Sequence, residues 1–423
     1  MRSVEDQLAT VIDAAVSPEP IRVALTDALG LMCAEEVAAT RPVPGFSQAA
    51  IDGYAVRAVD VGGNGGLTGR GAPSESERAR GESLPVVGEV AAGSQKPLRL
   101  QPRQAVRVAT GAPLPTLADA VLPLEWTDRG RKRMTPQRPV ATGDFVRAPG
   151  DDIQPGDIAV RQGAVLGPAQ IGLAAAAGRE KLLVYPRPRV AVMSYGLELV
   201  DLGRDPGLGQ VYDIASYVVA AAAKEAGADV NRVGIINAEP RKLRETITSQ
   251  VARSECLVIT GAVGGSGAAG IIDILRELGE IDTTRVAMHP GSVQGFGVLG
   301  EERIPVFLLP ANPVAALVIA ETILRPLIRR AQGKTALHRQ TVAARSLRAI
   351  DSIPGRRGYV RGRLMRDADT REYLVEALSV LEAAPTHLLA GFAEANAIIH
   401  IPEDTNHVRP GDVVQVEFLR QRS

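Results

Sequence analysis

The feature that most constrains the fold is a regular alternation of strand-like and helix-like runs between residues 187 and 333. Continuous apolar strands that alternate with helices predict a parallel sheet covered by helices on both faces, which is a three-layer α/β domain. We expect its strands at 189–194, 231–236 and 256–263, and its helices at 214–225, 240–252 and 271–278.

Ligands of such folds bind beyond the carboxyl ends of the strands. Here those ends are followed by loops at 195–199, 261–267 and 310–313, which form the candidate binding region. Residues 265–270 formally match the dinucleotide fingerprint G-x-G-x-x-G, but no acidic residue follows at the spacing that a ribose needs. A nicotinamide-dependent oxidoreductase is therefore the least favoured of three function classes. The same glycine-rich turn can cradle a phosphate or another anion, or be only a tight turn.

The rest of the chain divides into three further regions. Residues 1–50 and 147–186 are expected to form a helical stalk, because each segment contains one helix-like run. Residues 51–146 contain short β-like runs between Gly and Pro, and they predict a β-rich domain with a loop at 62–83. Residues 334–423 predict a closing all-β domain.

The charge balance excludes several kinds of partner. The 423 residues carry 48 Lys and Arg against 48 Asp and Glu, so no net charge attracts nucleic acid or an anionic membrane. The longest apolar run, 314–324, contains Glu321 and is too short to span a bilayer. The two cysteines lie far apart and fit neither a disulfide framework nor a zinc site. We expect a cytoplasmic protein without a signal peptide or membrane insertion.

Residues of catalytic types are present but form no established catalytic pattern by themselves. The five histidines lack the spacing of a histidine metal site, and the G-x-S-x-G motif of serine hydrolases is absent. Four carboxylates lie next to turns, where such residues more often cap a helix or a turn than catalyse. They are Asp52, Glu125, Asp152 and Asp213.

Five short motifs are spread along nearly the whole chain. They are Pro-Gly-Phe-Ser at 44–47, Ala-Ile-Asp-Gly-Tyr-Ala-Val at 50–56, Ala-Thr-Gly-Ala-Pro-Leu-Pro at 109–115, Asp-Asp-Ile at 151–153 and Arg-Pro-Arg-Val-Ala-Val at 187–192. The chain thereby resembles the MoeA (molybdopterin molybdenumtransferase) and gephyrin E-domain family, and within it a bacterial gephyrin-like branch with an eroded active site. The resemblance implies an elongated homodimer with a helical stalk, a β-rich domain, a molybdopterin-binding-type α/β domain and a C-terminal β-barrel.

For active relatives, the resemblance implies that adenylylated molybdopterin binds in a cleft, and that molybdate enters with a divalent cation such as Mg²⁺ as AMP leaves. Carboxylates suit the cation, and N–H or cationic donors suit the oxyanions. The positions that match site residues of the family are Asp52, Thr110, Glu125, Asp152 and Asp213. Those in the ligand-binding loops are Ser194, Gly196, Gly261, Gly264, Ser266, Pro310 and Asn312.

This chain departs from the family pattern in those same loops. Leu197 and Ala269 stand where the family has acids, and Ala215 stands where it has an Asn. His289 and Ser292 replace two lysines. Because an alkyl side chain cannot ligate Mg²⁺, we expect no metal site and a loss of transferase activity.

The preferred interpretation is therefore a gephyrin-like dimeric scaffold that requires no cofactor. The resemblance implies that short peptide tails bind at Leu8, Pro402, His407 and Val408. The candidate partners are the C-terminal tail of the tubulin-like cell-division protein and a membrane receptor, which would recruit the scaffold to the inner membrane face. The alternative is an active molybdopterin molybdenumtransferase that uses Mg²⁺ and adenylylated molybdopterin.

Overall fold

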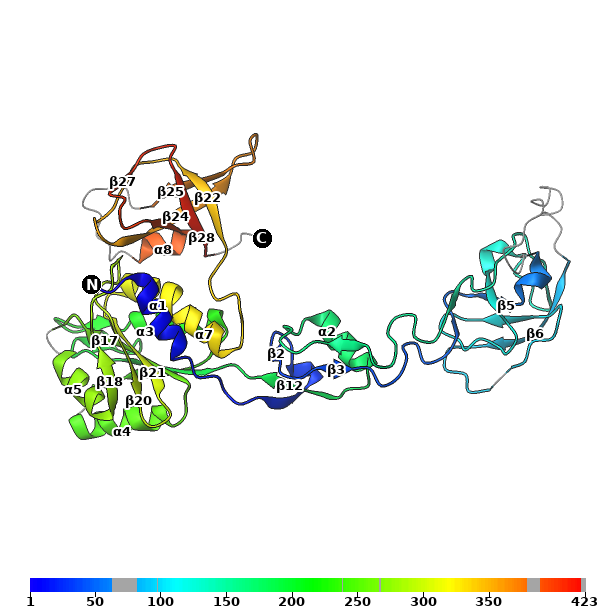
Figure 1. Cartoon of the computed structure of the whole chain (residues 1–423), viewed down its shortest axis with the longest axis horizontal. Helices are drawn as coiled ribbons and strands as arrows, with labels where there is room; N and C mark the ends of the chain where they lie inside the picture. Colours follow the sequence, from blue (N-terminus) through cyan, green and yellow to red (C-terminus); the bar gives the residue numbers. More distant parts are fainter. Residues whose placement is uncertain (63–81, 97, 238, 266–267, 379–388, 420–423) are drawn as a thin grey trace. The chain divides into compact units, whose positions relative to one another are not determined.

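The computed structural model describes residues 1–62, 82–96, 98–237, 239–265, 268–378 and 389–419 (Figure 1). They form two compact units. Unit 1 comprises Met1–Val23, Gly30–Ala34 and Leu183–Ser423, and unit 2 comprises Ala24–Leu29 and Glu35–Leu182. Ser266 and all but the ends of the loop expected at 62–83 lie outside the described residues. No helix among the described residues is long and apolar enough to cross a bilayer.

The main sheet of unit 1 has six strands in the order β16–β13–β17–β21–β20–β18. Their bounds are β16 (Asp229–Ile235), β13 (Arg189–Ser194), β17 (Cys256–Val263), β21 (Ile304–Pro310), β20 (Gly295–Leu299) and β18 (Gly279–Asp282). The first four strands are parallel, as predicted, but β20 is antiparallel to β21, and β18 to β20. Only residues 300–303 join β20 to β21, too few for the crossover that parallel strands need. The prediction of a parallel sheet is therefore wrong at this edge.

Helices cover both faces of this sheet, which confirms the three-layer prediction. One face carries α3 (Ala215–Ala226), α6 (Pro313–Ile319), the π-helical turn η4 (Ala320–Leu324) and α7 (Arg325–Ala331), and the other carries α4 (Pro240–Val251) and α5 (Ala268–Leu278). Alternate strand residues point to opposite faces. Val258 and Phe307 therefore pack in the first core, whereas Ile259 and Leu308 pack in the second.

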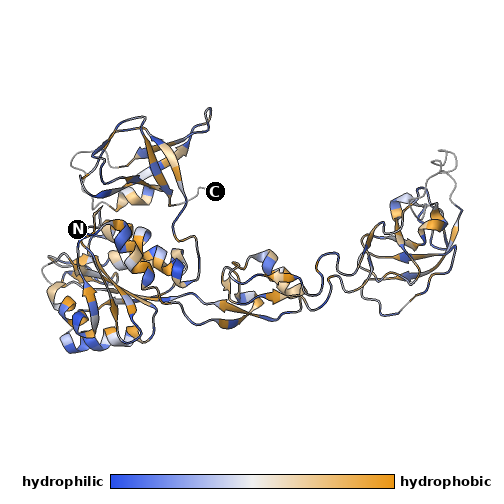
Figure 2. Cartoon of the chain, in the orientation of Figure 1, coloured by the Kyte–Doolittle hydropathy of each residue, from blue (hydrophilic) through white to orange (hydrophobic). Residues whose placement is uncertain are grey.

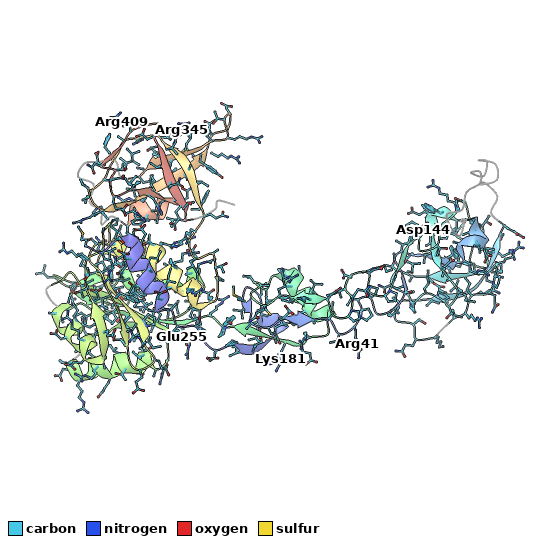
Figure 3. The ribbon with its side chains drawn as sticks, in the orientation of Figure 1. Arg41, Asp144, Lys181, Glu255, Arg345 and Arg409 are labelled. Carbon is cyan, nitrogen blue, oxygen red and sulfur yellow. The ribbon has the colours of Figure 1, made fainter. Side chains whose placement is uncertain are left out.

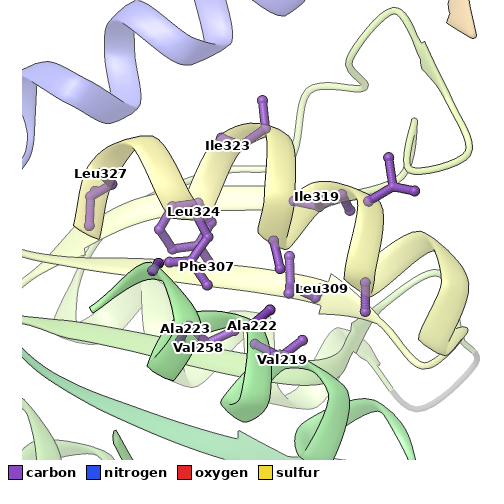
Figure 4. Close-up of a cluster of buried hydrophobic side chains, with 14 of the residues drawn as sticks. Val219, Ala222, Ala223, Val258, Phe307, Leu309, Ile319, Ile323, Leu324 and Leu327 are labelled. Carbon is purple, nitrogen blue, oxygen red and sulfur yellow. The ribbon is translucent and has the colours of Figure 1, made fainter. Parts of the chain in front are cut away.

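Apolar residues of the first core fill the space between the sheet and its helices. Figure 4 shows Phe307 of β21 between Val219 of α3 and Leu324 of η4. In Figure 2 hydrophobic residues follow the central strands of this domain, while the outward helix faces are hydrophilic. The strands and helices therefore hold the loops at the strand ends on a rigid support.

A buried carboxylate joins the starts of β13 and β17. Glu255, labelled in Figure 3, is buried and accepts a hydrogen bond of 2.6 Å from the backbone N–H of Arg189. The Arg189 guanidinium lies 2.5 Å from the other carboxylate oxygen, and this hydrogen bond raises the pKa of Arg189. The pair thus fixes both strands at the edge opposite the candidate loops.

Helix α1 (Val4–Asp13) packs on the α/β domain. The Ser3 hydroxyl caps it by accepting a hydrogen bond of 3.0 Å from the N–H of Asp6. Val4 and Val11 lie in the first core, against η4 and α7. The grouping of this helix with α2 (Pro168–Ala176) in one stalk is therefore incorrect, because α2 belongs to unit 2. Apolar spacing predicts which face of a helix is buried but not what covers it.

The C-terminal part of unit 1 is a closed five-stranded barrel, as expected. Its strands are β22 (Thr341–Ser346), β24 (Arg357–Arg366), β25 (Tyr373–Ala377), β26 (Ala397–Ile401) and β28 (Val413–Phe418), and pairing of β24 with β26 closes it. Strand β19 (Met288–His289) of the α/β domain adds to β24 in parallel. The shorter elements of unit 1 are β2 (Met32–Cys33), β12 (Lys181–Tyr185), β14 (Leu199–Val200), β15 (Val211–Tyr212), β23 (Ile350–Asp351), α8 (Ala390–Glu394) and β27 (His407–Val408).

Unit 2 contains the predicted β-rich domain, a five-stranded sheet in the order β8–β5–β7–β6–β9. The strands are β8 (Ala120–Pro123), β5 (Gly53–Val56), β7 (Ala105–Val108), β6 (Leu84–Val90) and β9 (Arg133–Met134). Tyr54 is fully buried in its core and donates a hydrogen bond of 3.0 Å to the Gly130 carbonyl. The remaining elements of unit 2 are η1 (Leu25–Asp27), β3 (Val37–Ala38), β4 (Gln48–Ala49), η2 (Ala58–Val61), η3 (Leu124–Trp126), β10 (Val146–Arg147) and β11 (Ile158–Val160). The strand β1 (Ile21–Ala24) crosses the unit boundary, with its first three residues in unit 1.

Candidate active site

The loops at the carboxyl ends of β13 and β17 meet closely, as the strand order requires. The N–H of Tyr195 donates a hydrogen bond of 2.8 Å to the Thr260 carbonyl. Gly261 has a φ of +77°, and a Cβ atom there would lie 1.9 Å from the Tyr195 carbonyl oxygen. Only glycine fits this position. The loop after β13 and the last residues of β17 are therefore held together by their backbones.

Asp213 is buried between the end of β13 and the start of α3. Its Oδ2 accepts hydrogen bonds of 2.5 Å from the hydroxyls of both Ser194 and Ser216, and one of 3.3 Å from Nη1 of Arg232. Its Oδ1 accepts a hydrogen bond of 3.2 Å from the backbone N–H of Ser216. Three of these donors converge on Oδ2, and one contacts Oδ1. Asp213 thus joins the end of β13 to the start of α3 through the hydroxyls of Ser194 and Ser216.

Arg232, a residue that the sequence analysis missed, extends this network outward. Its guanidinium lies 4.0 Å from the ring centroid of Tyr217, and its Nη2 donates a hydrogen bond of 2.9 Å to the Tyr217 hydroxyl. One quarter of the Arg232 side chain is exposed. The sequence did contain a signal for Arg232. A charged arginine within a β-type run needs a polar partner wherever its side chain is partly buried.

The loop after β13 is held by Asn237, which the sequence analysis also missed. The N–H of Gly196 donates a hydrogen bond of 3.0 Å to Oδ1 of Asn237, and Nδ2 of Asn237 donates to the Gly196 carbonyl. Leu197 follows with 84% of its surface exposed. Ala269, the other position expected to lack an acid, is exposed in the first turn of α5. Both positions therefore lie on accessible surface.

The other predicted loop residues have mainly structural contacts. Asn312, which follows Pro310 at the end of β21, caps α6 by accepting hydrogen bonds from the N–H groups of Val314 at 2.9 Å and Ala315 at 3.2 Å. Gly264 has a φ of +81°, and a Cβ there would lie 3.4 Å from Cγ1 of Val293. The loop that follows β19 therefore touches the loop that follows β17.

The three remaining substituted positions are wholly or partly buried. Ala215 and Ser292 are buried, and His289 is half-buried. Burial, together with the charge of Arg356, lowers the pKa of His289. His289 is therefore not a ready substitute for a permanently charged lysine.

In unit 2, three family-matching residues share one end of the sheet. Strand β5 is antiparallel to β7 and β8, so its first residue, Gly53, pairs with the last residues of both neighbours. Asp52 precedes β5, Thr110 follows β7 and Glu125 follows β8. Oδ1 of Asp52 accepts hydrogen bonds from the N–H of Thr110 at 2.8 Å and from its hydroxyl at 3.0 Å. These bonds lower the pKa of Asp52.

The five family-matching residues do not form one cluster within either unit. Asp213 belongs to unit 1. Asp152 lies in unit 2 beside Val43, to whose carbonyl its N–H donates a hydrogen bond of 3.0 Å. Within the described ranges, no three His, Cys, Asp or Glu side chains gather closely enough to hold a metal ion.

A hollow of about 580 Å³ in the barrel gathers three of the four residues expected to bind peptide: Pro402, His407 and Val408. Arg357 also lines it, and its guanidinium forms an ion pair of 2.6 Å with Glu5 of α1. Leu8 lies three residues after Glu5 on α1 and is not part of the wall. The structure therefore assembles most of this predicted group on the barrel alone.

Comparison with known proteins covers all parts of the chain. Residues 2–178 match the MoeA N-terminal region (domain I and II), residues 191–330 match a probable molybdopterin binding domain, and residues 343–419 match the MoeA C-terminal region (domain IV). Molybdopterin molybdenumtransferase 1 of Mycobacterium tuberculosis (strain ATCC 25618 / H37Rv) is 56% identical over 100% of both chains. Molybdopterin molybdenumtransferase 2 of the same organism is 33% identical over 98% of this chain and 99% of its own.

A solved structure agrees with these matches. The molybdopterin biosynthesis MoeA protein from Pyrococcus horikosii covers 99% of both chains with 29% identity and a TM-score of 0.79. Sequence similarity over the full length and the similar fold thus lead to the same group of proteins. The chain belongs to the MoeA family.

Proposed function

We propose that this chain is a molybdopterin molybdenumtransferase, which inserts molybdate into adenylylated molybdopterin as AMP leaves. The observation that carries the proposal is 56% identity, over the full length of both chains, to a protein of that name. This proposal replaces the scaffold with lost activity that the sequence analysis preferred. The substitutions at Leu197 and Ala269 are then differences within a working family.

Donor groups at the carboxyl edge of the unit 1 sheet suit such a substrate. The N–H of Ala268 at the start of α5 donates a hydrogen bond of 3.2 Å to the Gly265 carbonyl, and the next N–H groups of this helix start have no acceptor within their own helix and attract oxyanions such as phosphate or molybdate. Arg232 adds a partly exposed cation on the β16 side of this edge. Exposed Leu197 offers an apolar contact for a planar ring. In this proposal the chain binds and orients the substrate through these groups.

A magnesium ion does not fit the residues of this edge. Mg²⁺ needs several oxygen ligands, whereas Leu197 offers no oxygen and the buried Asp213 carboxylate already accepts four hydrogen bonds. The described carboxylates elsewhere form no cluster of three. No step of the proposed reaction is therefore assigned to a protein-bound Mg²⁺.

The test is a measurement of AMP release from adenylylated molybdopterin by the purified full chain. We expect release that depends on added molybdate, with sulfate as a control of the same charge and similar shape. Substrate binding without AMP release, or no binding at all, would refute the transferase.

A second candidate function, the binding of short peptide tails by a homodimer, is favoured by the hollow that contains Pro402, His407 and Val408. The proposed partners are the tail of the tubulin-like cell-division protein and a membrane receptor. Fluorescence anisotropy with the labelled tail peptide tests this function. His407→Ala is expected to weaken binding, whereas Arg41→Ala in unit 2 serves as a control. A monomer in light scattering would contradict the dimeric scaffold.

A further inference from the structure

Asn237 lies just beyond the end of β16. Its side chain is exposed, yet both the oxygen and the nitrogen of its amide form hydrogen bonds. Oδ1 accepts a hydrogen bond of 3.0 Å from the N–H of Gly196, and Nδ2 donates to the carbonyl of the same residue. Only this orientation of the amide is chemically consistent, because the reverse would place oxygen against oxygen and N–H against N–H. The two groups therefore form a reciprocal pair.

This pair continues the contact between β16 and β13 after the strands end. The last backbone bond between them is the 2.9 Å contact from the N–H of Ile236 to the carbonyl of Ser194. Beyond this bond, the side-chain amide of Asn237 forms the hydrogen bonds with Gly196 that the backbone of a strand residue would otherwise form. On its other side, Tyr195 is bonded to Thr260 and closely packed on Gly261. The loop at 195–197 is thus held from both neighbouring strands.

The position of the pair indicates a role in ligand binding rather than in general stability. Asn237 is exposed and polar, so its side chain is not part of the buried apolar packing of the α/β domain. The loop that it holds lies at the edge where ligands of this fold bind, and it ends in the exposed Leu197. A loop that is already ordered binds more tightly, since binding then costs less conformational entropy.

We propose that Asn237 is a positioning residue that keeps the loop at 195–197 in its substrate-binding conformation. The proposal rests on the transferase function proposed above. Without the amide the loop populates this conformation only part of the time, and the apparent affinity falls by that fraction. Substrate at saturating concentration would still select the competent conformation. The loss should therefore appear in KM and not in kcat.

The experiment compares Asn237→Ala and Asn237→Asp with the control Asn231→Ala. Asn231 is an exposed asparagine of β16, and its Nδ2 donates a long hydrogen bond of 3.4 Å to Oε1 of Gln250. Asn237→Ala is expected to raise KM for adenylylated molybdopterin about tenfold, the effect of two lost neutral hydrogen bonds. Asn237→Asp should be at least as impaired, because one carboxylate oxygen would face the Gly196 carbonyl.

Hydrogen exchange provides a readout that does not depend on activity. Amides of residues 195–199 should exchange faster in Asn237→Ala and unchanged in Asn231→Ala. An unchanged KM in Asn237→Ala overturns this inference and leaves the transferase in place, whether or not exchange accelerates. A lowered kcat at unchanged KM overturns it as well. Absence of molybdate-dependent AMP release in the unaltered chain overturns the transferase and, with it, this role for Asn237.

Discussion

Replacing Asp213 by alanine should destabilise unit 1 strongly, because the carboxylate is the common acceptor of a buried network. Ser194 and Ser216 are both fully buried, and each donates to Asp213 at 2.5 Å. A buried hydroxyl without a partner costs about 1–3 kcal/mol. The Ser194 hydroxyl would lose its partner, the Ser216 hydroxyl would keep only the hydrogen bond of 3.3 Å that it accepts from Arg232, and Arg232 would lose its buried anion, so we expect a destabilisation of about 3–5 kcal/mol.

A double-mutant cycle with Ser194→Ala isolates one of these contacts. Once Ser194 has no hydroxyl, loss of Asp213 leaves one fewer buried donor without a partner. The two substitutions should therefore cost less together than the sum of their separate effects, by about 1–2 kcal/mol. Ser254→Ala provides a matched control, since Ser254 is a buried serine of unit 1 outside this network.

Urea unfolding followed by two spectroscopic probes measures the loss of stability in unit 1 separately from unit 2. Trp126 is the single tryptophan and lies in unit 2, so its fluorescence follows that unit. Far-UV circular dichroism follows mainly the helices α1 and α3–α7 of unit 1. We expect Asp213→Ala to lower the midpoint measured by dichroism and not the one measured by fluorescence. A loss below about 1 kcal/mol, or no coupling to Ser194, would refute the assignment of Asp213 as a structural acceptor.

Three further predictions follow from contacts in unit 1. Gly261→Ala should cost more than about 2 kcal/mol, because its φ of +77° and the nearby Tyr195 carbonyl exclude a Cβ; a near-neutral result in urea unfolding would contradict this. Glu255→Gln should cost about 1–3 kcal/mol by weakening the charged pair with Arg189, and Glu277→Gln on the surface should not. The lowered pKa of His289 means that the folded state binds its proton less readily than the unfolded state. Unfolding free energy should therefore fall as pH drops below about 6.5, and His289→Gln should reduce this fall; identical pH profiles would disprove the claim.

Strands with continuous apolar runs were predictable from the sequence to the residue. Cys256–Val263 matches its predicted range because every position in this strand is buried or nearly so. The antiparallel hairpin of β20 and β21 was not foreseen, since strand direction depends on the connection and not on the apolar pattern. The position of α1 was missed for a similar reason, because its apolar face could pack on any core.

The site was predictable as a set of loops but not as a set of contacts. The strand ends correctly indicated where Ser194 and Gly261 lie. Arg232 and Asn237 escaped notice because each is a single polar residue whose partner lies 19 or 41 positions away. Spacing rules detect neighbours along a helix or strand, and they carry no information on such distant pairs.

The two-residue ladder between β19 and β24 makes the barrel inseparable from the α/β domain. Met288 pairs with Arg357, and Tyr359, Phe392 and Ile398 of the barrel lie in the same apolar core as Val4 and Val11. A chain cut at residue 333 would uncover this shared core and leave β19 without its neighbour. The boundary at 333–334 therefore divides the chain by sequence pattern only, and we expect the residues on its two sides to unfold together.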